Sequence, residues 1–298
     1  MTRLRGLCTA TAAVTLFLLS ACAQPIVDGA AGALPSGSAV PPAIPGDEDA
    51  LVLRVAHTGG FVGSDATTSR IPPISVYADG RVIFEGPVVL SYPGPALPNI
   101  QVQVISPTAV QQLIDKAVAA GVKEGADFGQ PGVADATTTE VTVLAADGKR
   151  TVAAAALSEA RADDPQLTPA QQEARKKLRA FTDELTNLSV QTTTGKPQPY
   201  QPEILAGVVT PYVEPGDDLP ARPQPKDWPG SALPGEPLST TLKLSCVTAT
   251  GDEADAILAA AKDANASTPW MSGGNGWNVR FRPLLPDETG CADLKAAR

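Results

Sequence analysis

Histidine is almost absent from this 298-residue chain, which restricts the catalytic chemistry that the sequence can support. A serine–histidine–acid or cysteine–histidine site would have to use the single histidine, His57, as its base. The chain has no Gly-x-Ser-x-Gly segment and no group of residues with the spacing of zinc ligands. It also has no glycine-rich phosphate loop after a strand. The sequence therefore indicates no catalytic residue, no metal and no cofactor.

Aromatic residues and positive charge are also scarce. Aromatic side chains make up only 4% of the residues, while hydrophobic and charged contents of 43% and 18% are ordinary for a globular protein. The core must therefore be built largely from valine, leucine, isoleucine and alanine. The formal net charge of −9 argues against nonspecific nucleic-acid binding, because phosphate neutralisation needs a basic face.

The N-terminal segment has the layout of a secretion signal. Arg3 and Arg5 precede the apolar stretch Leu7–Leu19, which is too short to span a bilayer. The stretch ends in Leu19-Ser20-Ala21-Cys22, which resembles the lipobox of bacterial lipoproteins. This resemblance implies removal of residues 1–21, a lipid on Cys22 such as palmitate, and a cell-membrane protein anchored on the extracytoplasmic face. The alternative is an ordinary secretory signal followed by an incidental cysteine.

Two cysteines, Cys246 and Cys291, remain once Cys22 is lipidated and the signal containing Cys8 is removed. In an exported protein, two such cysteines most simply form one disulfide. The alternative is two free thiols, one of them buried.

Changes in composition divide the chain into segments. Residues 22–50 are rich in proline, glycine, alanine and serine without periodicity, which predicts a disordered tether. Residues 51–190 predict an α+β domain, and residues 241–298 a small disulfide-closed α+β module. Residues 191–240 hold 11 of the 29 prolines and predict a linker, in which 204–212 could form one strand that returns to the first sheet.

Turn and cap signals define the fold expected for residues 51–190. The pairs Asp79-Gly80 and Asp147-Gly148 each separate two strand patterns, which predicts two-residue hairpins with positive φ at both central residues. Ser106-Pro107 and Thr168-Pro169 are typical helix starts. We therefore predict an α+β fold in which two hairpins build a mixed or antiparallel sheet with helices on one face.

Residues 51–157 resemble a domain of secreted lipoproteins from high-G+C Gram-positive bacteria, to which no activity is assigned. The matching residues are Gly59-Gly60-Phe61, Tyr77-Ala78-Asp79-Gly80, Ser106, Ala120-Gly121, Asp135 and Thr137-Thr138-Thr139. These are turn, cap and strand positions, so the resemblance implies a fold and no catalytic residue.

Two segments are candidate binding surfaces. Arg175, Lys176, Lys177 and Arg179 form a basic run, which is either a solvated helix face or a contact to anionic envelope polymer or lipid headgroups.

The second candidate surface lies in residues 268–285. Trp270 and Trp277 flank a glycine-rich turn, and Leu284 and Leu285 follow it. These four residues form either a partner-binding surface or the core of the small module.

These features predict a non-enzymatic, membrane-anchored envelope lipoprotein that binds another envelope component or protein. The alternative is an extracytoplasmic hydrolase that uses His57 or a pair of neighbouring carboxylates. The candidate pairs lie in predicted loops, where solvated acids are the usual interpretation. They are Asp47-Glu48-Asp49, Asp163-Asp164, Asp217-Asp218 and Asp287-Glu288.

Overall fold

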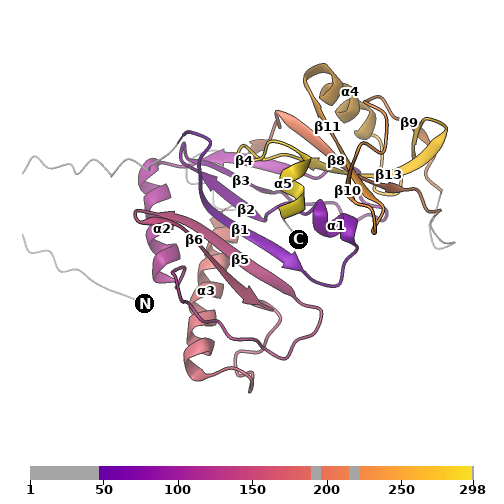
Figure 1. The fold of residues 1–298 in the computed structure, drawn as a ribbon. Helices are drawn as coiled ribbons and strands as arrows, with labels where there is room; N and C mark the ends of the chain where they lie inside the picture. Colours follow the sequence, from indigo (N-terminus) through magenta and orange to yellow (C-terminus); the bar gives the residue numbers. More distant parts are fainter. Residues whose placement is uncertain (1–46, 189–195, 215–221, 297–298) are drawn as a thin grey trace, which may run out of the picture. The chain divides into compact units, whose positions relative to one another are not determined.

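Two β-sheets organise the part of the chain that the computed structural model describes, residues 47–188, 196–214 and 222–296 (Figure 1). The first sheet has seven strands in the order β6-β5-β1-β2-β3-β4-β7, and the second has six in the order β10-β11-β8-β13-β12-β9. The predicted α+β class is confirmed. The predicted signal, Cys22 and nearly all of the predicted tether lie outside the described residues.

Both predicted hairpins are present in the first sheet. Its strands are β1 (Leu51–Gly59), β2 (Ile74–Tyr77), β3 (Arg81–Glu85), β4 (Ile100–Val104), β5 (Thr137–Ala145), β6 (Gly148–Ala155) and β7 (Gln198–Pro199). Only the glycine of each Asp-Gly pair has positive φ, +90° at Gly80 and +124° at Gly148. In the second hairpin Gly148 already pairs with Ala145, so the turn consists of Ala146 and Asp147. The predicted turn type is therefore wrong, although the hairpins form.

Gly80 is required by a close approach as well as by its φ. A Cβ atom at this position would lie 2.3 Å from the carbonyl oxygen of Ile105. Ile105 is held next to Gly80 because the Ile105 amide donates a hydrogen bond to the Gly80 carbonyl oxygen at 2.9 Å. The hairpin is thereby fixed to the start of the helix that follows β4.

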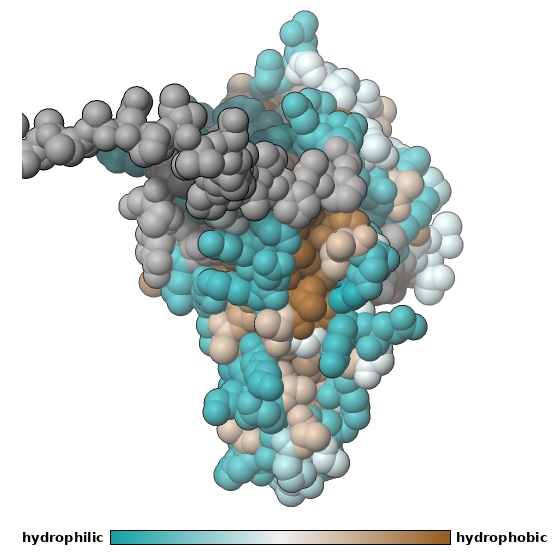
Figure 2. Space-filling view, turned by 90° about the vertical axis from the view of Figure 1, so that its left-hand side faces the viewer, coloured by the Kyte–Doolittle hydropathy of each residue, from teal (hydrophilic) through white to brown (hydrophobic). Residues whose placement is uncertain are grey.

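Two helices cover the first sheet, α2 (Pro107–Ala119) and α3 (Pro169–Leu188), as Figure 1 shows. Ser106 caps α2 by accepting a bond from the Ala109 amide, and Thr168 and Gln171 bond reciprocally at the start of α3. Their apolar faces share one core with β1, β2, β3, β5 and β6, with Val110, Leu113, Leu178 and Phe181 buried. The side of the molecule in Figure 2 is correspondingly hydrophilic over most of its area, with hydrophobic residues in a narrow strip.

The second sheet uses more of the chain than predicted. Its elements are β8 (Ile204–Pro211), β9 (Lys226–Asp227), β10 (Glu236–Ser239), β11 (Leu244–Thr250), α4 (Gly251–Ala261), β12 (Trp270–Ser272), β13 (Asn275–Pro283) and α5 (Cys291–Ala296). The remaining helix, α1 (Ser64–Thr68), follows β1. Strands β8, β9 and β10 lie within the range predicted as linker, so that range contributes to a folded sheet.

The predicted strand at residues 204–212 forms, but it does not return to the first sheet. It is β8, paired on one side with β11 and on the other with β13. Five consecutive residues of β8, from Leu205 to Val209, are buried. A strand buried on both faces belongs in the middle of a sheet, which is the position that β8 occupies.

The predicted disulfide between Cys246 and Cys291 is present. It joins β11 to the first residue of α5, with the two Cα atoms 5.9 Å apart. The two cysteines pack with Ala206, Val208, Leu284 and Leu294 in a core cluster between this helix and the sheet. The bridge thus ties the C-terminal helix to the interior of the second sheet.

Candidate functional site

The candidate surface around Trp270 is mostly core. Trp270 is only 1% exposed, and its ring lies edge-on to Trp228 and Phe281, at centroid distances of 5.6 and 5.7 Å. Leu284 and Leu285 are also buried. Side chains without exposed area offer nothing to a partner, so the structure removes these three residues from the candidate binding surface.

Trp277 lies at the edge of the same cluster. It is half-buried, packs against the core that contains Trp270 and Ile257, and donates from Nε1 to the Ser272 carbonyl at 3.4 Å. Trp228, Trp270 and Phe281 are the aromatic side chains that fill the interior of this cluster.

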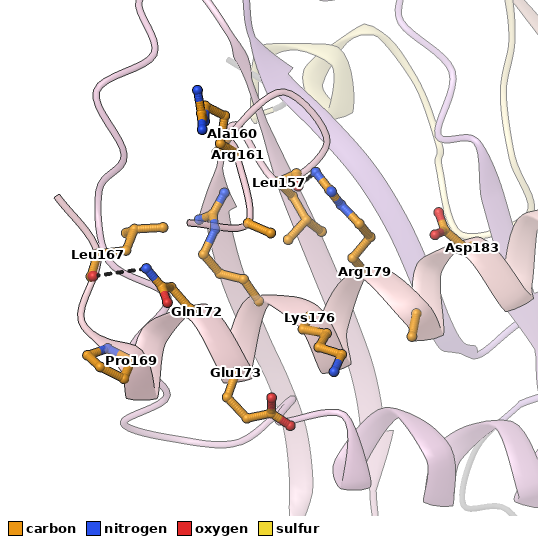
Figure 3. A pocket seen from close by; sticks show the side chains of 13 residues that line it. Leu157, Ala160, Arg161, Leu167, Pro169, Gln172, Glu173, Lys176, Arg179 and Asp183 are labelled. Carbon is orange, nitrogen blue, oxygen red and sulfur yellow. Dashed lines mark hydrogen bonds between the residues drawn. The ribbon is translucent and has the colours of Figure 1, made fainter. Parts of the chain in front are cut away.

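The basic run of α3 borders a cleft. The cleft has a volume of about 490 Å³ and lies between α3, from Pro169 to Asp183, and the connection from β6 to α3 (Figure 3). Leu157, Ala160 and Leu167 supply apolar lining from that connection, and Arg175, Lys176 and Arg179 supply basic groups from the helix. Arg161, Glu173 and Asp183 also line the cleft, which therefore combines apolar residues with four basic and two acidic side chains.

Arg175 is turned into the protein and is 6% exposed. Its guanidinium donates to the carbonyl oxygens of Phe128 at 3.1 Å, Ala155 at 2.8 Å and Ala156 at 2.7 Å. Ala156 has a φ of +48°, because the chain leaves β6 at this point, and its carbonyl has no strand partner. The planar guanidinium suits such a convergent set of acceptors. The interpretation of the run as a simple solvated face therefore does not hold for Arg175.

Arg179 lies one helical turn after Arg175 on the same side of α3. It donates to the carbonyl oxygen of Leu157, toward which its side chain points in Figure 3. Burial lowers the pKa of the Arg175 guanidinium, and the positive charge of Arg179 lowers it further. Within the described ranges neither arginine forms an ion pair with a carboxylate, whereas Arg161 pairs with Asp163. Two neighbouring arginines thus bond to carbonyl groups, while Asp164 and Glu159 act on Arg175 through their charge alone.

The two lysines of the run differ in their surroundings. Lys176 lines the cleft, whereas Lys177 is not among its lining residues and lies 3.8 Å from Glu173 across one helical turn. Both are exposed. The spacing of four between Arg175 and Arg179 puts them on one helix face, and this was the signal in the sequence that could have separated them from the lysines.

His57 lies near the end of β1 and beside Arg70. The Arg70 guanidinium donates to the carbonyl oxygens of His57 and Gly59, both at 3.0 Å. Burial, followed by the positive charge of Arg70, lowers the pKa of the His57 ring. Among the described residues no carboxylate is hydrogen-bonded to this ring.

The neighbouring acids Asp287 and Glu288 engage different arginines. Asp287 accepts bonds from Arg54 at 2.6 and 3.0 Å and from the Tyr77 hydroxyl at 2.7 Å. Glu288 accepts from the buried Arg282 at 2.7 Å and also caps the Leu285 amide. The Asp287 contacts join the first sheet to the C-terminal segment, and the Glu288 contacts hold that segment to the end of β13, so both carboxylates have a structural use.

The other carboxylate candidates are placed as follows. Asp163 pairs with Arg161, and Asp164 accepts the amide of Gln166. Asp49 pairs with Arg81. The pair Asp217-Asp218 lies outside the described residues.

Within residues 47–188, 196–214 and 222–296, no three histidine, cysteine, aspartate or glutamate residues gather as metal ligands. None of the helices in these ranges is long and apolar enough to cross a membrane. No protein-family model, curated protein or solved structure matches this chain. The cleft beside α3 is therefore considered on its geometry and charge alone.

Proposed function

We propose that this protein is a non-enzymatic lipoprotein, anchored to the cell membrane on its extracytoplasmic face, whose cleft beside α3 binds an anionic group of another envelope component. The observation that carries this proposal is the pair Arg175 and Arg179 at the cleft, which bond to backbone carbonyls and, among the described residues, form no ion pair with a carboxylate. A bound anion supplies the negative partner for both arginines, while the backbone carbonyls hold the two side chains in place.

The size and lining of the cleft support a ligand with an apolar portion. Its volume of 490 Å³ falls within the range of roughly 300–1,000 Å³ that is usual for small-ligand sites. Ala162, Pro169 and Ala180 are the exposed apolar residues of its lining, beside the basic groups. An anionic amphiphile, or an anionic polymer segment with an apolar substituent, matches both features.

The signal pattern and the disulfide support the proposed location. Disulfides persist mainly in oxidising compartments outside the cytoplasm, and the Cys246–Cys291 bridge fits that setting. The Leu19-Ser20-Ala21-Cys22 motif supplies the proposed anchor. Two acyl chains on one cysteine hold a protein stably, because burial contributes about 0.8 kcal/mol per CH₂ group.

The anchor is tested by replacing Cys22. A Cys22→Ala variant is expected to lose incorporation of labelled fatty acid, since no other cysteine stands at a lipobox. Fatty-acid labelling of expressing cells measures this loss. Unchanged labelling in the variant would show that the lipid is not on Cys22.

The cleft is tested by two matched charge reversals. Lys176→Glu is expected to weaken binding of decyl phosphate about tenfold, because it changes the charge at the cleft by two units. Lys177→Glu makes the same change one residue away, outside the cleft, and should alter binding less than twofold. Isothermal titration calorimetry below the micelle concentration measures both, with decanol as an uncharged control. Equal effects of the two variants, or equal binding of decanol, would contradict the cleft proposal.

A further inference from the structure

Large hydrophobic side chains that are well exposed concentrate in two loops. Of nine such residues in the described part of the chain, six lie in residues 60–63 and 86–99. Each of the six has half or more of its surface exposed, and Leu90 is completely exposed. They are Phe61, Val62, Val88, Val89, Leu90 and Tyr92. An exposed concentration of this kind marks a contact surface rather than the scattered apolar residues of an ordinary surface.

Both loops leave the same end of the first sheet. Strands β1 and β3 each pair antiparallel with β2, so they run in the same direction. The loop of residues 60–63 follows β1, and the loop of residues 86–99 follows β3. Both loops therefore begin at one end of the sheet, and together they are called the apolar loop pair.

The longer loop is held at its base and exposed at its tip. At the base, the Gly86 amide donates to the Asn99 oxygen at 2.7 Å, and the Asn99 side chain donates to the Pro87 oxygen at 2.8 Å. Farther along, the Ala96 amide donates to Ala264 and the Ala266 amide donates to Gly94, at 3.1 and 2.8 Å. The exposed tip, residues 88–92, lies between these fixed points, and its side chains do not collapse onto the protein.

We propose that the apolar loop pair inserts into the interfacial region of the lipid bilayer. No residue from 86 to 99 carries a charge, so the tip enters an apolar medium without desolvating an ion. Aliphatic side chains suit the acyl region, and Tyr92 and Phe61 are aromatic residues of the kind found near membrane interfaces. The lack of charge also makes an anionic polymer an unsuitable occupant.

The proposed anchor places the bilayer within reach of these loops. Residues 23–46, between Cys22 and the described part, span at most about 80 Å when fully extended. Strand β1 has nine residues and is about 30 Å long, and the apolar loop pair lies at the end where it finishes at Gly59. The connection is thus long enough for the loops and the anchor to share one membrane. This contact goes beyond the proposed function and does not require the acyl group.

Vesicle binding by the unacylated chain from residue 23 onward tests the proposal, because this chain contains the whole compact unit Pro41–Arg298. We expect it to partition onto phosphatidylcholine vesicles, and Val89→Ser/Leu90→Ser to reduce partition about tenfold. The control Val104→Ser/Leu242→Ser removes the same residue types at exposed positions outside the loops and should change partition less than twofold. Equal melting temperatures of all three proteins establish that the comparison concerns folded chains.

A probe in the loop identifies the occupant directly. A Leu90→Cys chain with a polarity-sensitive dye is expected to show a blue-shifted emission with vesicles, and quenching by lipids brominated on their acyl chains. No quenching, or equal loss of partition in the control variant, overturns the proposal. Loop-dependent dimers in light scattering, without vesicle binding, would also overturn it and assign the surface to a second copy of the chain.

Discussion

A Cys246→Ala/Cys291→Ala variant is expected to lose about 4 kcal/mol of unfolding free energy, as the chain-entropy model gives for a loop of this length. The bridge joins residues 45 positions apart, so it removes many conformations from the unfolded chain. In the folded chain it holds α5 against Ala206 and Val208 in the interior of the second sheet. Equilibrium unfolding in urea, monitored by tryptophan fluorescence, measures the loss because all three tryptophans lie in this part of the fold.

Reduced wild-type protein is the matched control for the disulfide variant. It lacks the bridge but keeps both sulfur atoms. The difference in unfolding free energy between reduced wild type and the double variant therefore measures the packing of the two cysteine side chains. The bridge itself is verified by intact mass after alkylation in denaturant, where reductant should add two labels. Denaturant is needed because both cysteines are buried and would not react in the folded chain even if they were free. Two labels without reductant, or a double variant as stable as wild type, would contradict this account.

Local signals in the sequence were sufficient to predict the hairpins of the first sheet and the starts of the helices that cover it. Ser106 and Thr168 each accept from an amide three residues away, so their capping role is visible in a short segment. The Asp-Gly pairs located both hairpins for the same reason. The turn type was not predictable from the pair alone, because strand register decides which residues form the turn, and Gly148 pairs with Ala145.

The second sheet depends on contacts between distant parts of the chain. The pattern of residues 204–212 indicates a buried strand, but it does not specify a partner. Strand β8 pairs with β11 and β13, which lie far along the chain, and only the folded structure shows this choice. Trp270 illustrates the same limit, because a tryptophan near glycines fits a core and a binding surface equally well.

The candidate cleft was predictable only in part. The sequence located the basic run, but the orientation of Arg175 follows from where the chain leaves β6. Ala156, which has a positive φ, presents its carbonyl to that side chain, and no local sequence pattern predicts this backbone conformation. The apolar lining comes from the β6–α3 connection, which the sequence marked only as a loop.

Replacing Asp287 with alanine is expected to lower the free energy of unfolding by about 3 kcal/mol, the lower end for breaking a buried ion pair. Its carboxylate accepts two bonds from Arg54 and one from Tyr77, and Tyr77 is fully buried. The variant leaves a largely buried guanidinium and a hydroxyl without this acceptor. Urea unfolding at pH 7 measures the change.

The contribution of Asp287 should depend on pH. Burial by itself raises the pKa of this carboxyl, but the hydrogen bond and charge of Arg54 and the bond from Tyr77 outweigh it, so the pKa lies below its usual value. The unfolded chain therefore binds this proton more tightly than the folded chain. The stabilisation is complete above the unfolded pKa of about 4 and is lost as the pH falls below it. The stability difference between wild type and Asp287→Ala should accordingly be constant from pH 7 to about 5 and shrink in more acidic solution.

Asp163→Ala provides the matched control for Asp287→Ala. Asp163 also accepts two bonds from one arginine, Arg161, at 2.9 and 3.0 Å, but both side chains are more than two-thirds exposed. Water replaces the lost contacts at such a site, so the unfolding midpoint should not change measurably. If burial is the cause of the effect at Asp287, the two variants must differ although each carboxylate accepts two bonds from one arginine. A similar loss of unfolding free energy at both positions would assign the effect to the bidentate contact itself. An unchanged midpoint for Asp287→Ala would show that the junction between the first sheet and the C-terminal segment does not depend on this carboxylate.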